Sequence, residues 1–459
     1  MDKHRPYRSP IPQYQRNSMT NRTLAEWLQY QTTLTVHAIE LGLDRIGSVW
    51  CNMGAPAPGR IVVTVTGTNG KGSTVAMLDA CLRAMGLRTG CYTSPYLHRY
   101  NEQIRIIGNC VDDEQLVAAF ERIDACRAAI PLTGFEFATL AAFDLMARAD
   151  LDVTLLEVGM GGRTDAVNIV DADVAVITTV DLDHLAWLGQ DRNSIGREKG
   201  GIARRGRPAV VGEHEPPQGL LDELSERGAV PVRRDIQYRF DKPTAQGWRW
   251  HHADGTTLTL PLLPLEAPVQ YDNAACVIAT LHALRDALLR CRHERGEAVE
   301  AGTFAVQFSE AIAAGLQSVR IPGRLQRIKG EPDVVVDVGH NPQAALALAD
   351  WLRTSAYRRV RAVYGALTDK DVEGVVRALG PLVAEWHLID LSQETPRGMP
   401  MGELFTRVRA AVPRALVEVQ PDVASAIVAL RKSADAGDCI LTFGSFFVAK
   451  AALSTVDAE

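Results

Sequence analysis

The stretch that decides the fold is residues 61–74, which read IVVTVTGTNGKGST. Its first six residues are mostly β-branched and lie between Gly59 and Gly67, a pattern typical of a buried strand. A glycine-rich loop follows and leads into a segment of helical composition, residues 73–85. In this order of elements, backbone N–H groups and the helix N-terminus point at one phosphate group. Lys71 reaches the β- and γ-phosphate oxygens of a nucleotide. The stretch therefore predicts a phosphate-binding loop.

The loop departs from the usual pattern G-x-x-x-x-G-K-[ST] at two positions. Val65 replaces the first glycine of the pattern. Gly72 stands at the position of the usual Ser or Thr, whose hydroxyl binds magnesium, so Ser73, Thr74 or a residue elsewhere would have to ligate the metal. On the motif alone, a switch GTPase and a small-molecule kinase remain open alternatives. The alternative without a binding function is an ordinary turn with an exposed lysine.

Strands and helices alternate on both sides of this stretch, which predicts an α/β fold with mainly parallel sheets. A hairpin is expected at Asp254-Gly255, and a Pro/Gly break at residues 321–324 predicts a domain boundary. The expected strands are 89–93, 152–158, 173–180, 333–336, 361–364, 386–389 and 439–443, and the main expected helices are 114–129, 137–149, 274–292, 343–354 and 372–379. The predicted parts are a loose extension (1–22), a central domain (23–320) and a C-terminal domain (321–459).

Composition narrows the class of protein. The 459 residues carry 49 basic and 55 acidic side chains, a net charge of −6 that argues against binding to nucleic acid by bulk charge. No apolar run approaches the length of a membrane helix, and no signal peptide is recognisable. The eight cysteines are scattered and predict reduced thiols. We expect a cytoplasmic monomer that binds neither nucleic acid nor membrane.

Polar, glycine-rich clusters follow four of the expected strands. Besides the phosphate loop, they begin at Glu157, Asp181 and Asp337, and two of them include His184 and His340. Because ligands collect at the carboxyl ends of parallel strands, these clusters predict a ligand crevice between two domains.

Residues 67–73 resemble the phosphate loop of the Mur ligase superfamily and, within it, of the folylpolyglutamate synthase/dihydrofolate synthase family. The resemblance runs from about residue 35 to residue 450. It is carried by further blocks: LGLDRI at 41–46, TSPYL at 93–97, LTGFE at 132–136, EVGMGGRTD at 157–165, REK at 197–199, QYDNAA at 270–275 and DVGHNP at 337–342. It implies an N-terminal P-loop ATPase domain of the Mur ligase type and a smaller, Rossmann-like C-terminal glutamate-ligase domain.

The activity that the resemblance implies is ATP-dependent addition of L-glutamate to dihydropteroate, forming dihydrofolate, and to reduced folates, forming folylpolyglutamates. The carboxylate would become an acyl phosphate, and ADP and phosphate would be released. We expect the bacterial bifunctional enzyme, although a single activity stays open. The alternatives are another Mur ligase, such as one for cell-wall precursors, and a nucleotide-dependent switch or binding protein.

The resemblance also implies roles for residues. Two Mg²⁺ ions, with Mn²⁺ as an alternative, would be held by Ser94, Glu157, His184 and a carbamylated Lys199, and Lys71, Glu157, His184 and Lys199 would be catalytic. The implied ATP contacts are Gly67, Thr68, Asn69, Gly70, Lys71, Gly72, Ser73, Asn273, Arg324, Asp337 and His340. The implied pterin contacts are Asp44, Arg45, Thr133, Phe135, Glu136, Gly162, Arg163 and Asp165, and Ser445 is placed near the incoming glutamate.

Overall fold

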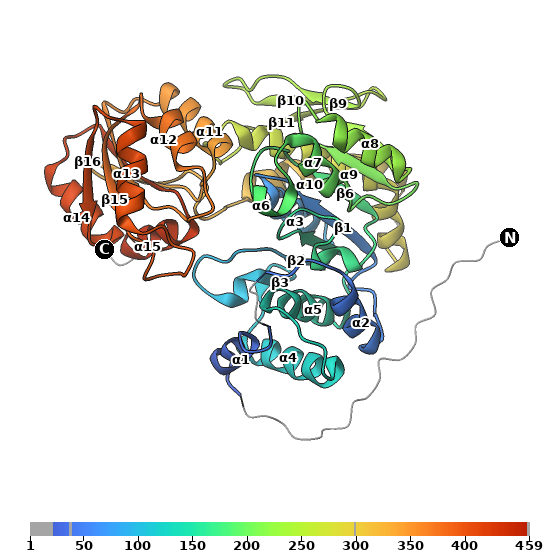
Figure 1. The fold of residues 1–459 in the computed structure, drawn as a ribbon. Coiled ribbons are helices and arrows are strands. Elements are labelled where there is room, and N and C mark those ends of the chain that lie inside the picture. Colours follow the sequence, from blue (N-terminus) through green and yellow to red (C-terminus); the bar gives the residue numbers. More distant parts are fainter. Residues whose placement is uncertain (1–21, 36–38, 298–299, 457–459) are drawn as a thin grey trace.

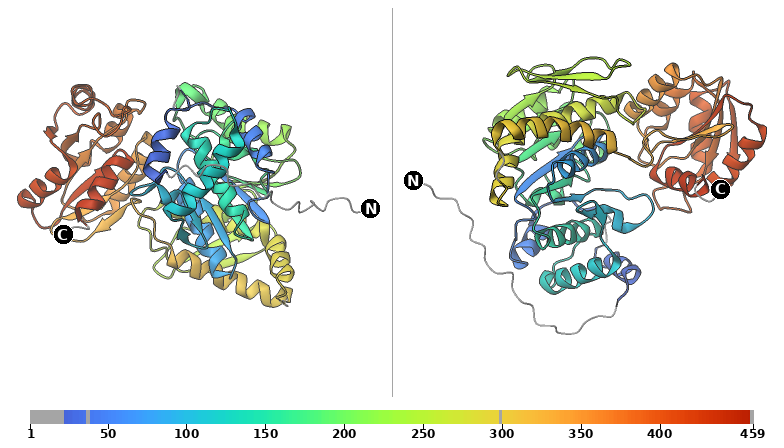
Figure 2. Two further views of the ribbon diagram at one scale, coloured as in Figure 1. Left: turned by 90° about the horizontal axis from the view of Figure 1, so that it is seen from below. Right: turned by 180° about the vertical axis from the view of Figure 1, so that it is seen from behind.

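The structure is a computed structural model that describes residues 22–35, 39–297 and 300–456. The expected N-terminal extension, residues 1–22, therefore lies outside the described residues except for Arg22. Two α/β units, each built on its own mainly parallel sheet, lie side by side (Figures 1 and 2). The α/β class with mainly parallel sheets is confirmed.

The first unit is built around β1 (Ile61–Thr66), which lies between β5 (Val153–Glu157) and β6 (Val174–Ile177) and is parallel to both. Every residue of β1 is buried, as expected for a central strand. The eight strands follow the order β4-β3-β2-β5-β1-β6-β7-β8, in which β3 is antiparallel to β2 and β4. The other strands are β2 (Thr89–Tyr92), β3 (Ile104–Ile106), β4 (Asn109–Cys110), β7 (Pro208–Val211) and β8 (Val230–Arg233).

Helices cover both faces of this sheet, because side chains alternate along each strand. Val63 and Val65 of β1 belong to a core with α3 (Lys71–Ala84), α9 (Val269–Glu294) and α10 (Ala301–Ser318). Val62 belongs to the core of the opposite face. The helices of that face are α1 (Leu24–Gln31), α2 (Asp44–Asn52), α4 (Asp113–Arg127), α5 (Gly134–Ala147), α7 (Arg192–Gly200) and α8 (Gln218–Glu226). Shorter pieces are η1 (Tyr100–Gln103), η2 (Ala166–Ile169) and α6 (Leu185–Leu188).

A small antiparallel sheet lies over α9. It consists of β9 (Tyr238–Phe240), β10 (Trp248–His252) and β11 (Thr257–Leu260). The expected hairpin at Asp254-Gly255 is confirmed, with Gly255 at φ +93° in the turn. The Nε1–H of Trp250 donates to the carbonyl of Ala275 on α9 at 3.1 Å, which ties the small sheet to this helix.

The second unit begins after α10 and carries six strands in the order β12-β13-β17-β14-β15-β16, parallel except for the β12–β13 pair. The strands are β12 (Gln326–Ile328), β13 (Asp333–Val336), β14 (Arg359–Tyr364), β15 (Val383–Ile389), β16 (Leu416–Gln420) and β17 (Asp438–Phe443). The helices are α11 (Pro342–Thr354), α12 (Val372–Leu379), α13 (Met401–Ala411), α14 (Val423–Ser433) and α15 (Phe446–Val456). Among the described helices of both units, none is long and apolar enough to cross a membrane.

Candidate functional site

A cavity of about 320 Å³ lies where the carboxyl ends of the first sheet face the second unit. It is lined by residues of β1, α3, β5 and α9 from the first unit, and by residues around β13 and α11 from the second. The structure brings all of the sequence-predicted nucleotide and metal residues to this cavity. They are Gly67, Thr68, Asn69, Gly70, Lys71, Gly72, Ser73, Ser94, Glu157, His184, Lys199, Asn273, Arg324, Asp337 and His340.

The loop between β1 and α3 has the geometry of a phosphate cradle. Gly70 caps α3 at φ +85°, a backbone conformation that favours glycine. A Cβ at this position would lie 2.5 Å from Oδ1 of Asn273, so the loop and α9 approach each other closely. The Lys71 ammonium donates to the carbonyl of Gly67 at 2.9 Å, and burial lowers its pKa. The loop thus holds a cation over a concave backbone, which suits a phosphate group.

Glu157 ends β5 and turns its buried carboxylate into the cavity. The N–H of Ser94 donates to its Oε2 at 3.4 Å. Burial raises the pKa of Glu157 to about 7, against the opposing influence of the Lys71 and Arg324 charges. A divalent cation would offset that burial cost, and a carboxylate beside a hydroxyl supplies the hard oxygen ligands of Mg²⁺ or Mn²⁺. The residues present therefore fit the implied metal.

His184 stands at the start of α6 with φ +52°. Its ring nitrogens lie 4.0 Å from Asp183 of the same loop and 4.0 Å from Asp369 of the second unit. Burial lowers the pKa of His184 to about 4, so the imidazole is neutral at physiological pH. The neutral ring is the form that ligates a metal ion.

Lys199 lies in α7, only 3% exposed, and lines the same cavity. Burial and repulsion by Lys71 lower the pKa of Lys199 to about 7. A substantial share of its amine is therefore neutral near pH 7, unlike that of an ordinary surface lysine.

Arg324 enters the cavity from the segment between α10 and β12. Its Nη1 is buried and has no hydrogen-bond partner among the described residues, and burial lowers its pKa. The charges of Asp337 and Glu157 act on this guanidinium, and its Cζ lies 5.5 Å from the ring centroid of Phe446. A buried cationic donor without a partner is costly unless an anion binds it.

Asp337 is engaged by the backbone. Its Oδ1 accepts from the N–H of Gly339 at 2.6 Å and its Oδ2 from that of Leu325 at 2.8 Å. These contacts hold the loop after β13 in place, so the predicted contact of Asp337 with the nucleotide stays a prediction.

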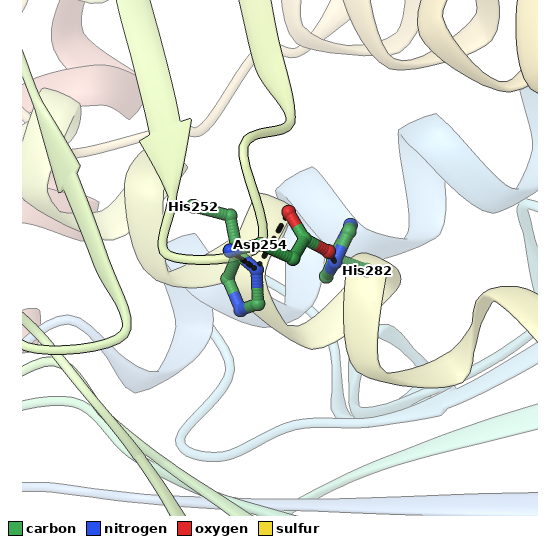
Figure 3. Close-up of side chains that lie close together, drawn as sticks. All are labelled: His252, Asp254 and His282. Carbon is green, nitrogen blue, oxygen red and sulfur yellow. Dashed lines mark hydrogen bonds and ion pairs between the residues drawn. The ribbon is translucent and has the colours of Figure 1, made fainter.

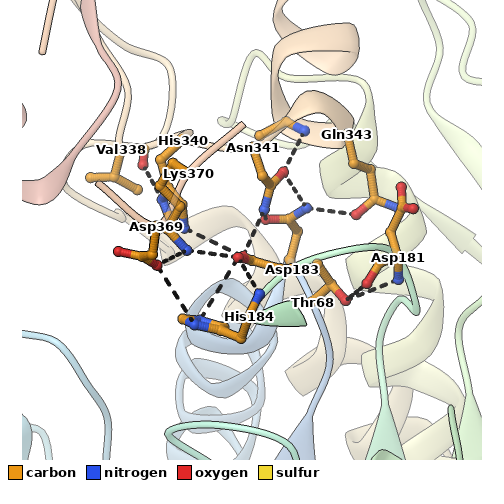
Figure 4. Close-up of polar contacts among 12 residues, drawn as sticks. Thr68, Asp181, Asp183, His184, Val338, His340, Asn341, Gln343, Asp369 and Lys370 are labelled. Carbon is orange, nitrogen blue, oxygen red and sulfur yellow. Dashed lines mark hydrogen bonds and ion pairs between the residues drawn. The ribbon is translucent and has the colours of Figure 1, made fainter. Parts of the chain in front are cut away.

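A polar network that the sequence did not reveal joins the two units at the rim of the cavity (Figure 4). Lys370 donates to Asp183 at 2.7 Å, and the Asn341 amide donates to Asn69 at 3.0 Å. Burial acts to raise the pKa of Asp183, but contacts with His340, Lys370 and His184 hold the pKa well below its usual range. Asp183 belonged to a visible cluster at a strand end, whereas nothing in the sequence distinguished Lys370.

The predicted pterin residues lie apart from the lining of this cavity. Thr133 and Glu136 form a capping box at the start of α5, a structural role for both polar groups. Arg45 pairs with Glu136 at 3.2 Å. The ring of Phe135 lies directly against Gly159, which does line the cavity, because a Cβ there would come within 2.6 Å of it.

Three of the remaining four predicted pterin residues also have partners within the protein. Arg163 pairs with Glu223 at 2.6 Å, and Gly162 packs against the backbone of α7. Asp165 accepts from the N–H of Met160 at 2.9 Å, and burial raises its pKa to about 6. Asp44 opens α2 and is exposed. The pterin assignments therefore remain predictions.

Comparison with known proteins places these features in context. Residues 65–216 match the Mur ligase middle domain, and residues 323–446 match the Mur ligase glutamate ligase domain. The dihydrofolate synthase/folylpolyglutamate synthase of Escherichia coli K12 is 40% identical, covering 95% of this chain and 96% of the relative.

Two solved structures are similar over almost the whole chain. One is E. coli FolC in complex with DHPP and ADP, with a TM-score of 0.85, 39% identity and coverage of 96% and 99% of the two chains. The other is a bifunctional folylpolyglutamate synthase/dihydrofolate synthase with Mn, AMPPNP and L-glutamate bound, with a TM-score of 0.83, 39% identity and coverage of 95% and 98%.

Proposed function

The chain belongs to the dihydrofolate synthase/folylpolyglutamate synthase family of Mur ligases, and we propose that this one cavity adds L-glutamate both to dihydropteroate and to reduced folates. The family assignment makes the protein an ATP-dependent glutamate ligase. The proposal covers three points: the use of both acceptors as substrates, the acyl-phosphate intermediate and the roles of individual residues.

One observation carries the proposal. A phosphate loop with Lys71 from one unit and the guanidinium of Arg324 from the other line the same cavity, and the buried Nη1 of Arg324 has no hydrogen-bond partner among the described residues. Two cations that face each other from separate units suit the terminal phosphates of ATP. Lys71 and Arg324 would contact the same phosphates only when the two units are in contact.

The chemistry follows from this placement. The acceptor's carboxylate oxygen attacks the γ-phosphorus, the bond to the β-phosphate oxygen breaks, and ADP leaves. Lys71 and Arg324 neutralise the charge that develops during transfer. The amine of L-glutamate then attacks the acyl carbon, and phosphate leaves with one oxygen of the original carboxylate. Water must be excluded in between, since it would hydrolyse the acyl phosphate.

Four residues would hold the metal in this scheme: Ser94, Glu157, His184 and Lys199. We propose two Mg²⁺ ions, which when bound would neutralise phosphate charge. The neutral amine of Lys199 would add CO₂ and release a proton to become a carbamate. The lysine side chain, which would repel the metals when protonated, thereby becomes an anion that can ligate one of them.

The experiment that tests the dual activity offers each acceptor separately. Purified protein with ATP, Mg²⁺ and L-glutamate is given dihydropteroate or tetrahydrofolate, with a UDP-linked sugar peptide as the control acceptor. We expect glutamate-dependent ADP release with each of the first two and none with the control. Turnover with one folate acceptor alone would refute the dual activity while leaving the family assignment intact.

A further inference from the structure

A second cluster of metal-ligating side chains lies where the β10–β11 hairpin turns over α9 (Figure 3). His252 ends β10, Asp254 lies in the turn and His282 lies on α9. One ligand atom from each residue can be chosen so that all three lie within 4.8 Å of one another. None of the three lines the ATP cavity, so the mechanism above does not use them.

The geometry places one carboxylate across two imidazoles. Asp254 Oδ1 lies 3.0 Å from Nδ1 of His252, and Asp254 Oδ2 lies 2.9 Å from Nε2 of His282. The two ring centroids are 4.2 Å apart. Figure 3 shows Asp254 between the two histidines, one contributed by the hairpin and one by the helix.

Hydrogen bonds alone do not satisfy this arrangement. The contact of His252 Nδ1 with the carboxylate requires a proton on that nitrogen. The backbone N–H of Asp254 points at the same Nδ1 at 3.3 Å and requires a lone pair there. A cation bound to the lone pair of Nδ1 would take the place of the proton between this nitrogen and the carboxylate, and the long 3.3 Å contact of the Asp254 N–H would then be given up.

The ligands are also held in place. The Trp250 ring stacks on that of His252 at 5.8 Å and 15°, and Trp250 is itself anchored to α9 by its Nε1–H. The N–H of Thr256 donates to Asp254 Oδ1 at 2.8 Å. Oriented ligands of this kind are characteristic of metal sites. The Asp254 side chain is 47% exposed, which leaves a path for an ion.

We propose that His252, Asp254 and His282 bind a Zn²⁺ ion that fastens the hairpin to α9. Two imidazole nitrogens with one carboxylate are ligands typical of zinc, whereas Mg²⁺ prefers oxygen throughout. Three protein ligands leave the fourth tetrahedral position to water. An open fourth position is more common in catalytic zinc sites, but this ion would join two elements that are distant in the sequence and would lie outside the ATP cavity, so its role would be to hold the hairpin on α9.

The test compares three full-length proteins without a histidine tag: the parent, His282→Gln and His251→Gln. The glutamine amide at 282 can still hydrogen-bond to Asp254 but ligates zinc poorly. His251 is the matched control, since it lies next to His252 on β10 and bonds Asp241 and Thr257 instead. After chelator treatment, Zn²⁺ is titrated by calorimetry and the Tm is recorded with and without the ion.

We expect the parent and His251→Gln to bind one more equivalent of Zn²⁺ than His282→Gln, or to bind it at least tenfold more tightly, and to gain Tm on binding. Equal stoichiometry, affinity and Tm shift in all three proteins would overturn the proposal. Should His282→Gln not fold, Asp254→Asn replaces it, because Asp254 is an exposed turn residue. Crystals of the parent soaked in Zn²⁺ give an independent answer: an anomalous peak must lie between His252 and His282, and peaks confined to the ATP cavity would contradict the site.

Discussion

At the scale of single residues, the buried amine of Lys199 bears most directly on the chemistry. Its pKa of about 7 reflects burial and repulsion by Lys71, so the neutral form that the proposed carbamylation requires is well populated. Glu157, which lines the same cavity, has its pKa raised to about 7 by burial. Both shifts reduce the charge on these two side chains in the free protein, which suits the proposed metal site.

We predict that Lys199→Ala lowers kcat at least ~100-fold, the scale of losing a principal electrostatic contact. A short carboxylic acid added to this variant should restore part of the rate by standing in for the carbamate. The matched control is Lys432→Ala, a change at an exposed residue of α14 in the second unit, which should keep full activity and not respond to the acid. Full activity of Lys199→Ala without the acid would show that the lysine is not a metal ligand.

The strand patterns of residues 61–66, 152–158 and 333–336 placed the phosphate loop, Glu157 and Asp337 at strand ends, whereas the ATP contacts of Asn273 and Arg324 were implied only by the family resemblance. Sequence reasoning did not identify Lys370, because its ion pair with Asp183 joins two units that are distant in the sequence. The polar groups of Thr133 and Glu136 form a capping box, and their predicted contact with the pterin stays a prediction. A capping box and a ligand site use the same residue types, so the sequence did not separate the two roles.

At the scale of elements, the junction of β1, its loop and α3 sets the position of the phosphates. We predict that Gly70→Ala weakens binding of an ATP analogue at least tenfold, because a Cβ there would lie 2.5 Å from Oδ1 of Asn273 at φ +85°. Gly86→Ala is the control: it has a similar φ of +77°, but nothing lies within 4 Å of the added Cβ. Calorimetry should show parental affinity for Gly86→Ala. Equal affinity of both variants would contradict a phosphate-binding role for the loop.

Apolar periodicity predicted most of the helices and strands, and the exceptions have a physical cause. The expected strand 333–336 and helix 372–379 coincide with β13 and α12, whereas α7 was not anticipated. Its sequence, RNSIGREKG, contains a single large apolar residue. Gly196 and Gly200 instead let α8 approach closely, since a Cβ at either would meet α8 or Pro217 at about 2.8–2.9 Å. Packing through glycines leaves no apolar stripe for a sequence pattern to reveal.

At the scale of the whole molecule, the proposed mechanism requires the two units to meet over the nucleotide. The pair of Lys370 and Asp183 crosses this junction and is nearly buried. We predict that Lys370→Met lowers the rate of glutamate addition at least tenfold but changes affinity for an ATP analogue less than threefold, because Lys370 lies outside the cavity lining. Asp183 would keep its contacts with His340 and Asn341, so the loss of stability should be smaller than the ~3–5 kcal/mol of leaving a buried charge uncompensated.

The control for this prediction is Arg407→Gln, which breaks a pair with Glu373 at 2.8 Å inside the second unit. It should leave both turnover and nucleotide affinity at parental values. Loss of nucleotide affinity in Lys370→Met as large as its loss of turnover would mean that the residue supports the ATP site itself, and not the approach of the two units.

The central claim is that the acceptor's carboxylate is activated as an acyl phosphate, and the path of its oxygen tests this most directly. The acceptor is prepared with both carboxylate oxygens labelled as ¹⁸O and turned over with ATP and L-glutamate, and the products are separated by chromatography. Mass spectrometry of the phosphate should show one ¹⁸O per molecule, alongside ADP. Unlabelled phosphate, or AMP and pyrophosphate in place of ADP and phosphate, would contradict the account.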